Sequence, residues 1–275
     1  MNNILVPIDF SEPARNAATY ALEFAKQTSA KVTFLHVYPM PTVATEMPVL
    51  LSSYDEIEHD SLNLLKQMAE ELRSKLNYTS PIECLVGPGY LLETVKEVVK
   101  EKSIDLIIMG ITGAGAITER LIGSNATVII KHVNCSTLVV PTEAAFKPIH
   151  TIAFATDFEN IENSTAVKEI KNICETFNSK LRIVNVVHPH QVLSYDKSLS
   201  GMLLDSIFDK TDHSIHLPEG DLADGINKVV DEQKADLLVM IPRKHAIFSE
   251  IITERHTKKM AFHTHIPLLT IHEDI

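Results

Sequence analysis

Tryptophan is absent from this chain of 275 residues, and cysteine and glycine are scarce, with three and nine copies. The cysteines Cys84, Cys135 and Cys174 lie far apart and form no CxxC pair, which argues against a zinc knuckle and a disulfide framework. Aromatic residues make up 6% of the chain, whereas hydrophobic residues make up 45%. We therefore expect an aliphatic core, as in sheets that are buried on both faces.

Basic charge and long apolar runs are missing as well. The formal net charge is −11 at pH 7, which argues against a nucleic-acid partner because such proteins normally show a basic face. No run approaches the ~18 apolar residues that a membrane helix needs, so no membrane partner is expected. The N-terminal sequence lacks the basic start, apolar stretch and cleavage site of a secretory signal. We therefore expect a cytoplasmic protein.

Short apolar runs alternate with helical patterns through the first half of the chain. Strands are predicted at residues 3–8, 31–37, 82–86, 105–109 and 137–140. Apolar residues recur three or four positions apart, which is typical of helices, at residues 14–27, 54–76, 90–100 and 125–132. Because such strands and helices are joined by right-handed crossovers, the pattern predicts a parallel sheet with helices on both faces.

The second half of the sequence repeats the first. The repeated segments are ILVPIDF and IAFATDF (Ile4–Phe10 and Ile152–Phe158), LHVYP and VVHP (Leu35–Pro39 and Val186–Pro189), and the ungapped pair Gly89–Met109 and Gly220–Met240. A repeat over nearly the whole chain indicates a duplicated domain. We predict an α/β protein with two tandem doubly wound domains, residues 1–144 and 145–275, each with a five-stranded, mainly parallel sheet.

Four of the nine glycines fall between Gly110 and Gly123, directly after the apolar run IDLIIM. Ligands of open parallel sheets sit at the carboxyl ends of the strands, where a glycine-rich loop brings backbone N–H groups close to a phosphate. Ser124 and Asn125 open a predicted helix, whose N-terminus carries about half a positive charge. Neither GxxxxGK[ST] nor GxGxxG occurs in the chain. The alternative is that these glycines only form the turn between a strand and a helix.

The spacing of this cluster is G-x2-G-x9-G-[ST]. Together with VPIDFSEPARNAATYAL near the N-terminus, LHV at residues 35–37 and CSTLVVP at residues 135–141, it resembles the universal stress protein family, and the chain looks like a tandem two-domain member. The resemblance implies an adenine-nucleotide α-hydrolase-like fold and, for members that carry the motif, binding of ATP with or without Mg²⁺. Family members pair through their last strands, which implies intramolecular pairing of the two domains here and leaves a homodimer open.

The resemblance also assigns roles to particular residues. Those at the adenine and ribose end would be Pro7, Asp9 and Val37. Those that run along the nucleotide and hold its phosphates would be Met109, Gly110, Gly113, Gly123, Ser124 and Asn125. Asp9 could instead cap the first helix, but Ser11, followed by Glu12 and Pro13, is the better cap. We therefore expect Asp9 to be free to face a ligand.

The glycines of the cluster are lost in the second domain. The ungapped alignment puts Ile241 opposite Gly110, and it puts Lys244, Glu254 and Arg255 opposite the remaining motif positions. Glu254 would place a carboxylate where a triphosphate needs an amide. We therefore expect only the first domain to hold nucleotide, with an architectural or regulatory role for the second.

Nine of the thirteen histidines follow residue 150, including the pairs His188/His190, His213/His216 and His263/His265. Such pairs chelate metals when they share a face, but no carboxylate or cysteine completes a set, and no metal site is expected. No G-x-S-x-G or HExxH motif occurs either. The sequence predicts a sensor or regulator that binds ATP. Two alternatives remain, a slow adenine-nucleotide hydrolase and a partner-binding module without nucleotide.

Overall fold

A computed structural model describes residues 1–39, 51–111, 124–158, 164–187, 195–241 and 265–272. The chain divides into two compact units, described separately below. The first unit comprises residues 1–111 and 124–146, and the second contains residues 147–275. The predicted boundary between residues 144 and 145 stays a prediction. No helix in the described part of the chain is long and apolar enough to cross a membrane.

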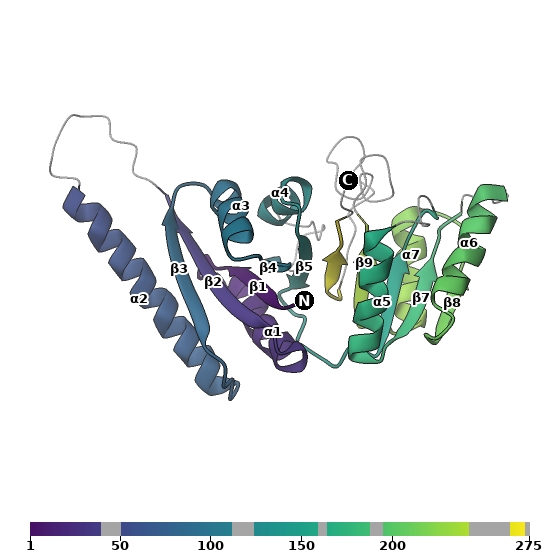
Figure 1. Ribbon diagram of the computed structural model, residues 1–275, viewed down its shortest axis with the longest axis horizontal. Coiled ribbons are helices and arrows are strands. Elements are labelled where there is room, and N and C mark those ends of the chain that lie inside the picture. The colour runs from purple at the N-terminus through teal and green to yellow at the C-terminus, as the bar shows by residue number, and fades with distance from the viewer. Residues whose placement is uncertain (40–50, 112–123, 159–163, 188–194, 242–264, 273–275) are drawn as a thin grey trace. The chain divides into compact units, whose positions relative to one another are not determined.

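The first unit is a five-stranded parallel sheet flanked by helices (Figure 1). Across the sheet, the strands follow the order β3 (Ile82–Pro88), β2 (Lys31–Tyr38), β1 (Asn3–Pro7), β4 (Leu106–Ile111) and β5 (Ser136–Pro141). The helices are α1 (Glu12–Thr28), α2 (Leu51–Lys75), α3 (Leu91–Glu101) and α4 (Ser124–His132). An ion pair between Arg15 of α1 and Glu71 of α2 joins two of these helices, while α3 contacts α4. The parallel pairing of neighbouring strands confirms the predicted parallel sheet.

Apolar periodicity explains most of the first unit's core. The predicted inner face of α1 is buried, including Tyr20 and Phe24, which are 2% and 3% exposed. In α2 the buried face is narrow. Leu65 is fully buried, whereas its neighbour Leu64 is 55% exposed, because consecutive residues of a helix point about 100° apart.

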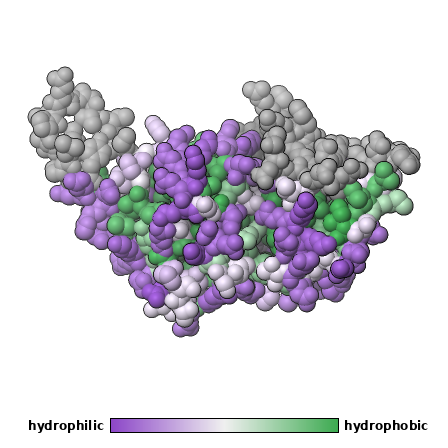
Figure 2. Space-filling view, in the orientation of Figure 1, coloured by the Kyte–Doolittle hydropathy of each residue, from purple (hydrophilic) through white to green (hydrophobic). Residues whose placement is uncertain are grey.

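The second unit has the same topology. Its strands follow the order β10 (Leu268–Thr270), β9 (Leu237–Met240), β6 (Thr151–Ala155), β7 (Lys180–Val184) and β8 (His213–His216), and all neighbours pair in parallel. Its helices are α5 (Thr165–Phe177), α6 (Tyr195–Ile207) and α7 (Leu222–Glu232). Hydrophilic residues dominate the described surface in Figure 2, but α6 exposes two large apolar side chains, Leu199 and Met202.

The duplication extends to unusual backbone angles. Phe10 and Phe158, which follow the first strand of each unit, have φ angles of 63° and 64°. Gly89 and Gly220, which precede the third helix of each unit, have φ angles of 117° and 131°. Positive φ is uncommon for a phenylalanine, so its recurrence shows that the backbone has the same conformation at this position in both units.

An aspartate before the fourth strand anchors the start of the first strand in each unit. In the first unit, the Asp105 carboxylate accepts hydrogen bonds from Asn2 N and Asn3 N at 2.6 and 3.2 Å. In the second, Asp236 Oδ2 accepts from His150 N and Thr151 N at 2.8 and 3.0 Å. These carboxylates accept hydrogen bonds from backbone amides at the amino ends of β1 and β6.

The structure corrects the sequence alignment of the second strands by one residue. His36 Nδ1 donates to Ile8 O at 2.7 Å, and Asn185 Nδ2 donates to the equivalent Thr156 O at 2.8 Å. His36 therefore corresponds to Asn185. The pairing of LHVYP with VVHP had instead placed Val186 opposite His36. Matching valines in apolar segments gave the wrong register, whereas the hydrogen bonds define it.

Candidate functional site

A cavity of about 310 Å³ opens at the carboxyl ends of the first unit's strands, at the lower end of the range of small-ligand pockets. Its walls come from the ends of β1, β2 and β4, the start of α3 and the first turns of α1 and α4. The lining residues are Pro7, Ile8, Asp9, Ser11, Ala14, Leu35, Val37, Pro39, Gly89, Tyr90, Leu91, Met109, Gly110 and Asn125. Most of the lining side chains are apolar, and Asp9, Ser11, Tyr90 and Asn125 add polar groups.

Most of the residues predicted to contact a nucleotide come together in this cavity. Those on its wall are Pro7, Asp9, Val37, Met109, Gly110 and Asn125. Ser124 begins α4 beside Asn125 and is exposed, but it is not part of the wall. Gly113 and Gly123 lie outside the described residues. Chain topology thus gathers positions from four separated segments, while their contact with a ligand stays a prediction.

Three helices begin at the cavity. Ser11 and Ala14 belong to the start of α1, Tyr90 and Leu91 to the start of α3, and Asn125 to the first turn of α4. Each helix N-terminus carries a partial positive charge and amide donors without intrahelical partners. Asp9 is the only ionisable acidic or basic residue on the described wall. The site therefore suits an anion held by helix ends and amides rather than by lysine or arginine.

Asp9 and Ser11 form a small turn at the cavity edge. Ser11 caps α1 as predicted, since its Oγ accepts a hydrogen bond from Ala14 N at 3.3 Å. Asp9 Oδ1 accepts from both Ser11 N at 3.0 Å and Ser11 Oγ at 2.5 Å. The expectation that Asp9 is free is thus only half correct, because one carboxylate oxygen holds the turn.

Gly110 is required by packing. A Cβ atom built on Gly110 would lie 2.1 Å from Pro13 O and 2.3 Å from Pro13 C, in the first turn of α1. Because the obstacle is backbone, no side-chain rotation relieves the clash. This glycine lets α1 begin directly against the end of β4, which places the helix N-terminus at the cavity. The structural and ligand-binding explanations of this glycine are therefore linked.

The sequence pattern did not indicate the β3–α3 side of the site, where Gly89, Tyr90 and Leu91 line the cavity. The available signal was the difference between GYLL in the first unit and GDLA in the second, within segments that otherwise align. Tyr90 replaces the aspartate that the second unit has at this position.

The second unit differs from the first around the position that corresponds to Gly110. The helices α1 and α5 both end in a left-handed residue, Ser29 and Asn178, but α1 has 17 residues and α5 has 13. The additional N-terminal turn of α1 contains the backbone that approaches Gly110. Ile241, which corresponds to Gly110 in the second unit, is 8% exposed. The other substituted motif positions, Lys244, Glu254 and Arg255, lie outside the described residues.

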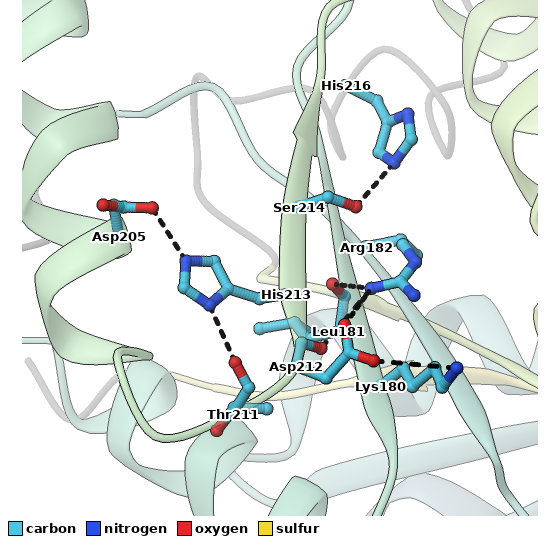
Figure 3. Close-up of polar contacts among 9 residues, drawn as sticks. All are labelled: Lys180, Leu181, Arg182, Asp205, Thr211, Asp212, His213, Ser214 and His216. Carbon is cyan, nitrogen blue, oxygen red and sulfur yellow. Dashed lines mark hydrogen bonds and ion pairs between the residues drawn. The ribbon is translucent and has the colours of Figure 1, made fainter.

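Polar side chains on β8 and nearby elements bond to one another (Figure 3). His213 bonds to Asp205 Oδ1 and Thr211 O, both at 2.9 Å, while His216 Nε2 and Ser214 Oγ are 2.9 Å apart. The two histidines point to opposite sides of the strand, because residues three apart on a strand face opposite ways. They cannot share a metal ion. Among the described residues, no group of three potential ligands forms a metal site.

A family model described as the universal stress protein family matches residues 1–141 and, a second time, residues 148–272. A universal stress protein of Methanocaldococcus jannaschii is 31% identical over 142 residues, which are 50% of this chain and 80% of that protein. A putative universal stress protein of Staphylococcus haemolyticus is 28% identical over 142 residues, 51% of this chain and 85% of that protein.

Among solved structures, a universal stress protein of Archaeoglobus fulgidus has a TM-score of 0.68 at 15% identity, covering 99% of this chain and 96% of that chain. This likeness shows a shared fold over both units. The double match of the family model agrees with the duplicated backbone turns and strand orders. The chain therefore belongs to the universal stress protein family and carries two copies of its domain in tandem.

Proposed function

We propose that the first unit binds an adenine nucleotide, ATP, and that this binding serves a stress response. The observation that carries the proposal is the convergence of Asp9, Val37, Gly110 and Asn125 on one cavity at which three helices begin. The apolar wall suits a base and ribose, and the start of α4 suits phosphates. Ser124, Gly113 and Gly123 are proposed to complete the phosphate end.

A divalent cation would find few ligands on the protein. Asp9 is the only carboxylate on the described wall, and its Oδ1 already holds Ser11. Mg²⁺ is commonly bound through one or two carboxylates together with substrate phosphates. We therefore propose that any Mg²⁺ arrives with the nucleotide and is held mainly by its phosphates.

Binding rather than rapid hydrolysis fits the wall of this cavity. Phosphoryl transfer needs cationic groups on the leaving phosphates and a residue that orients the attacking water. The described wall provides neither a lysine nor an arginine. We expect slow turnover at most, and a steady-state assay that found many turnovers per minute would favour the hydrolase instead.

We propose that the second unit does not hold a nucleotide. Its α5 lacks the first turn that α1 places against the cavity, and Ile241 fills the position of Gly110. A structural or regulatory role remains for this unit. Pairing of the two domains through their last strands, and a homodimer, stay predictions.

The test is calorimetry with ATP on the wild-type protein and on Asn125→Asp. Asn125 lies in the first turn of α4, which contains no acidic residue. The added carboxylate should weaken ATP binding about tenfold by repulsion of the phosphates. It should at the same time leave the fold intact or stabilise α4 by about 0.3–1 kcal/mol, because acids favour helix N-termini.

Thr165→Asp is the matched control. Thr165 is exposed in the first turn of α5, which also contains no acidic residue. This variant has the same change of charge but lies in the second unit, and it should bind ATP like the wild type. Absence of heat and of a thermal shift in the wild type at millimolar ATP would show that the proposal is wrong. If Asn125→Asp and the wild type bind ATP with equal affinity, the phosphates do not lie at the start of α4.

A further inference from the structure

Tyr90 is the most exposed large hydrophobic residue beside the cavity. Its side chain is 81% exposed, yet the residue lines the cavity wall. It follows Gly89, whose φ of 117° fixes the turn between β3 and α3. Tyr90 therefore combines a place on the cavity wall with an exposed aromatic residue, on a turn with a defined conformation.

Comparison of the two units shows that the fold does not require a tyrosine here. Tyr90 and Asp221 occupy the same N-cap position of α3 and α7, two helices of 11 residues. The Asp221 carboxylate accepts from Ala223 N at 3.0 Å and from Asp224 N at 3.5 Å. Tyr90 makes no side-chain cap bond. The first unit thus forgoes a stabilising cap and exposes an aromatic ring instead.

The position of Tyr90 in the sheet order indicates which part of a ligand it would meet. Tyr90 follows β3, whereas Gly110 ends β4 and Asn125 begins α4. The strands β2 and β1 lie between β3 and β4, so the two ends of the site are about 14 Å apart at ~4.8 Å per strand. This span separates the base of a nucleotide from its phosphates.

We infer that Tyr90 stacks on the base of the nucleotide bound by the first unit, an inference that rests on the proposed function. The exposed ring offers a flat apolar face, and aromatic stacking tolerates different bases because each base has a π-face. Val37 and Pro39, which line the cavity near the end of β2, would contact the edges of the same base. Tyr90 is therefore assigned as a base-binding residue that the motif does not contain.

The chain offers a direct spectroscopic test because it contains no tryptophan. In Tyr90→Trp, the single indole should emit as an exposed group in the free protein. Adenosine and ATP should quench or shift this emission, whereas inorganic tripolyphosphate, which has no base, should leave it unchanged. Unchanged emission at an ATP concentration at which calorimetry shows saturation would overturn the inference.

Two further variants separate stacking from folding. Tyr90→Asn supplies a neutral cap for α3 and should raise the urea midpoint of unfolding while it weakens ATP binding about tenfold. Tyr90→Phe keeps the aromatic ring and should bind ATP with an affinity within about twofold of the wild type. If the wild type binds ATP and Tyr90→Asn binds it equally well, this inference is wrong while the proposed function stands. If the wild type binds no ATP, both are wrong.

Discussion

Substitution of Gly110 with alanine should destabilise the first unit even without any ligand. The new Cβ would lie 2.1 Å from Pro13 O, whereas real Cβ atoms essentially never come closer than 3.0 Å to another heavy atom. The start of α1 must therefore move by about 1 Å. Overpacking of this kind costs about 1–3 kcal/mol, and we expect the upper end because the obstacle is backbone. For a domain of this size, 3 kcal/mol corresponds to roughly 10 °C in Tm.

The assay is urea and thermal unfolding followed by circular dichroism, with and without ATP. Because the chain has two units, the transition of the first unit is identified as the one that ATP shifts to higher denaturant. The Gly110→Ala variant should lower this transition and leave the other in place. ATP affinity should fall as well, because the displaced turn of α1 forms part of the cavity wall.

Gly201→Ala provides the control. Gly201 lies inside α6, and the nearest atom to its new Cβ would be Phe158 Cε2 at an ordinary 3.7 Å. Alanine is favoured over glycine in helices by about 1 kcal/mol, so this variant should be neutral or more stable. If the urea midpoint of Gly110→Ala equals that of the wild type, the packing argument is refuted. Ligand binding would then be the only remaining explanation for Gly110.

Three further predictions concern stability and reactivity. Burial raises the pKa of the Cys174 thiol to about 12, so mass spectrometry should find it unmodified by iodoacetamide in the native protein at pH 8; rapid labelling would mean that α5 opens. Burial and the nearby Arg182 lower the pKa of His216 below 6.5, despite an opposing effect of Glu232. The unfolded state then binds more protons, so the stability contributed at pH 7 is lost as the pH falls below 6.5 through the lowered pKa. The urea midpoint should depend less on pH between 5 and 7 in His216→Gln, and an identical dependence would contradict this. Asp105→Ala should lower the unfolding free energy by about 1–2 kcal/mol, because two amides at the start of β1 lose their acceptor; an unchanged urea midpoint would show that water replaces it.

Periodicity predicted the fold because each strand of a parallel sheet is an apolar run and each helix an amphipathic repeat. It also placed Asp9, Val37 and Gly110 at strand ends, which topology brings to one edge of the sheet. It aligned β2 with the second unit wrongly by one residue, because the end of β2 was matched to Val186 and Val187, which follow β7. The hydrogen bonds of His36 and Asn185 resolve the difference, and the pairing of β1 with β2 and of β6 with β7 agrees with them.

Two features of the site required three-dimensional information. The closeness of Gly110 to α1 depends on how the helix crosses β4, which no local pattern records. Tyr90 was missed because an exposed tyrosine before a helix has no distinctive spacing. Its meaning comes from comparison with Asp221, which occupies the same turn in the second unit and caps the helix.

The shorter α5 has a consequence for the second unit. With one turn fewer at its start, the strand position opposite Gly110 is free to hold a large side chain, and Ile241 is now 92% covered. Substitution of Ile241 with glycine would leave a cavity in the core and cost about 3 kcal/mol or more, without adding a turn to α5. A wall like that of the first unit would need both a glycine at this position and a longer α5. A single substitution therefore cannot give the second unit the local structure that the first unit has at Gly110.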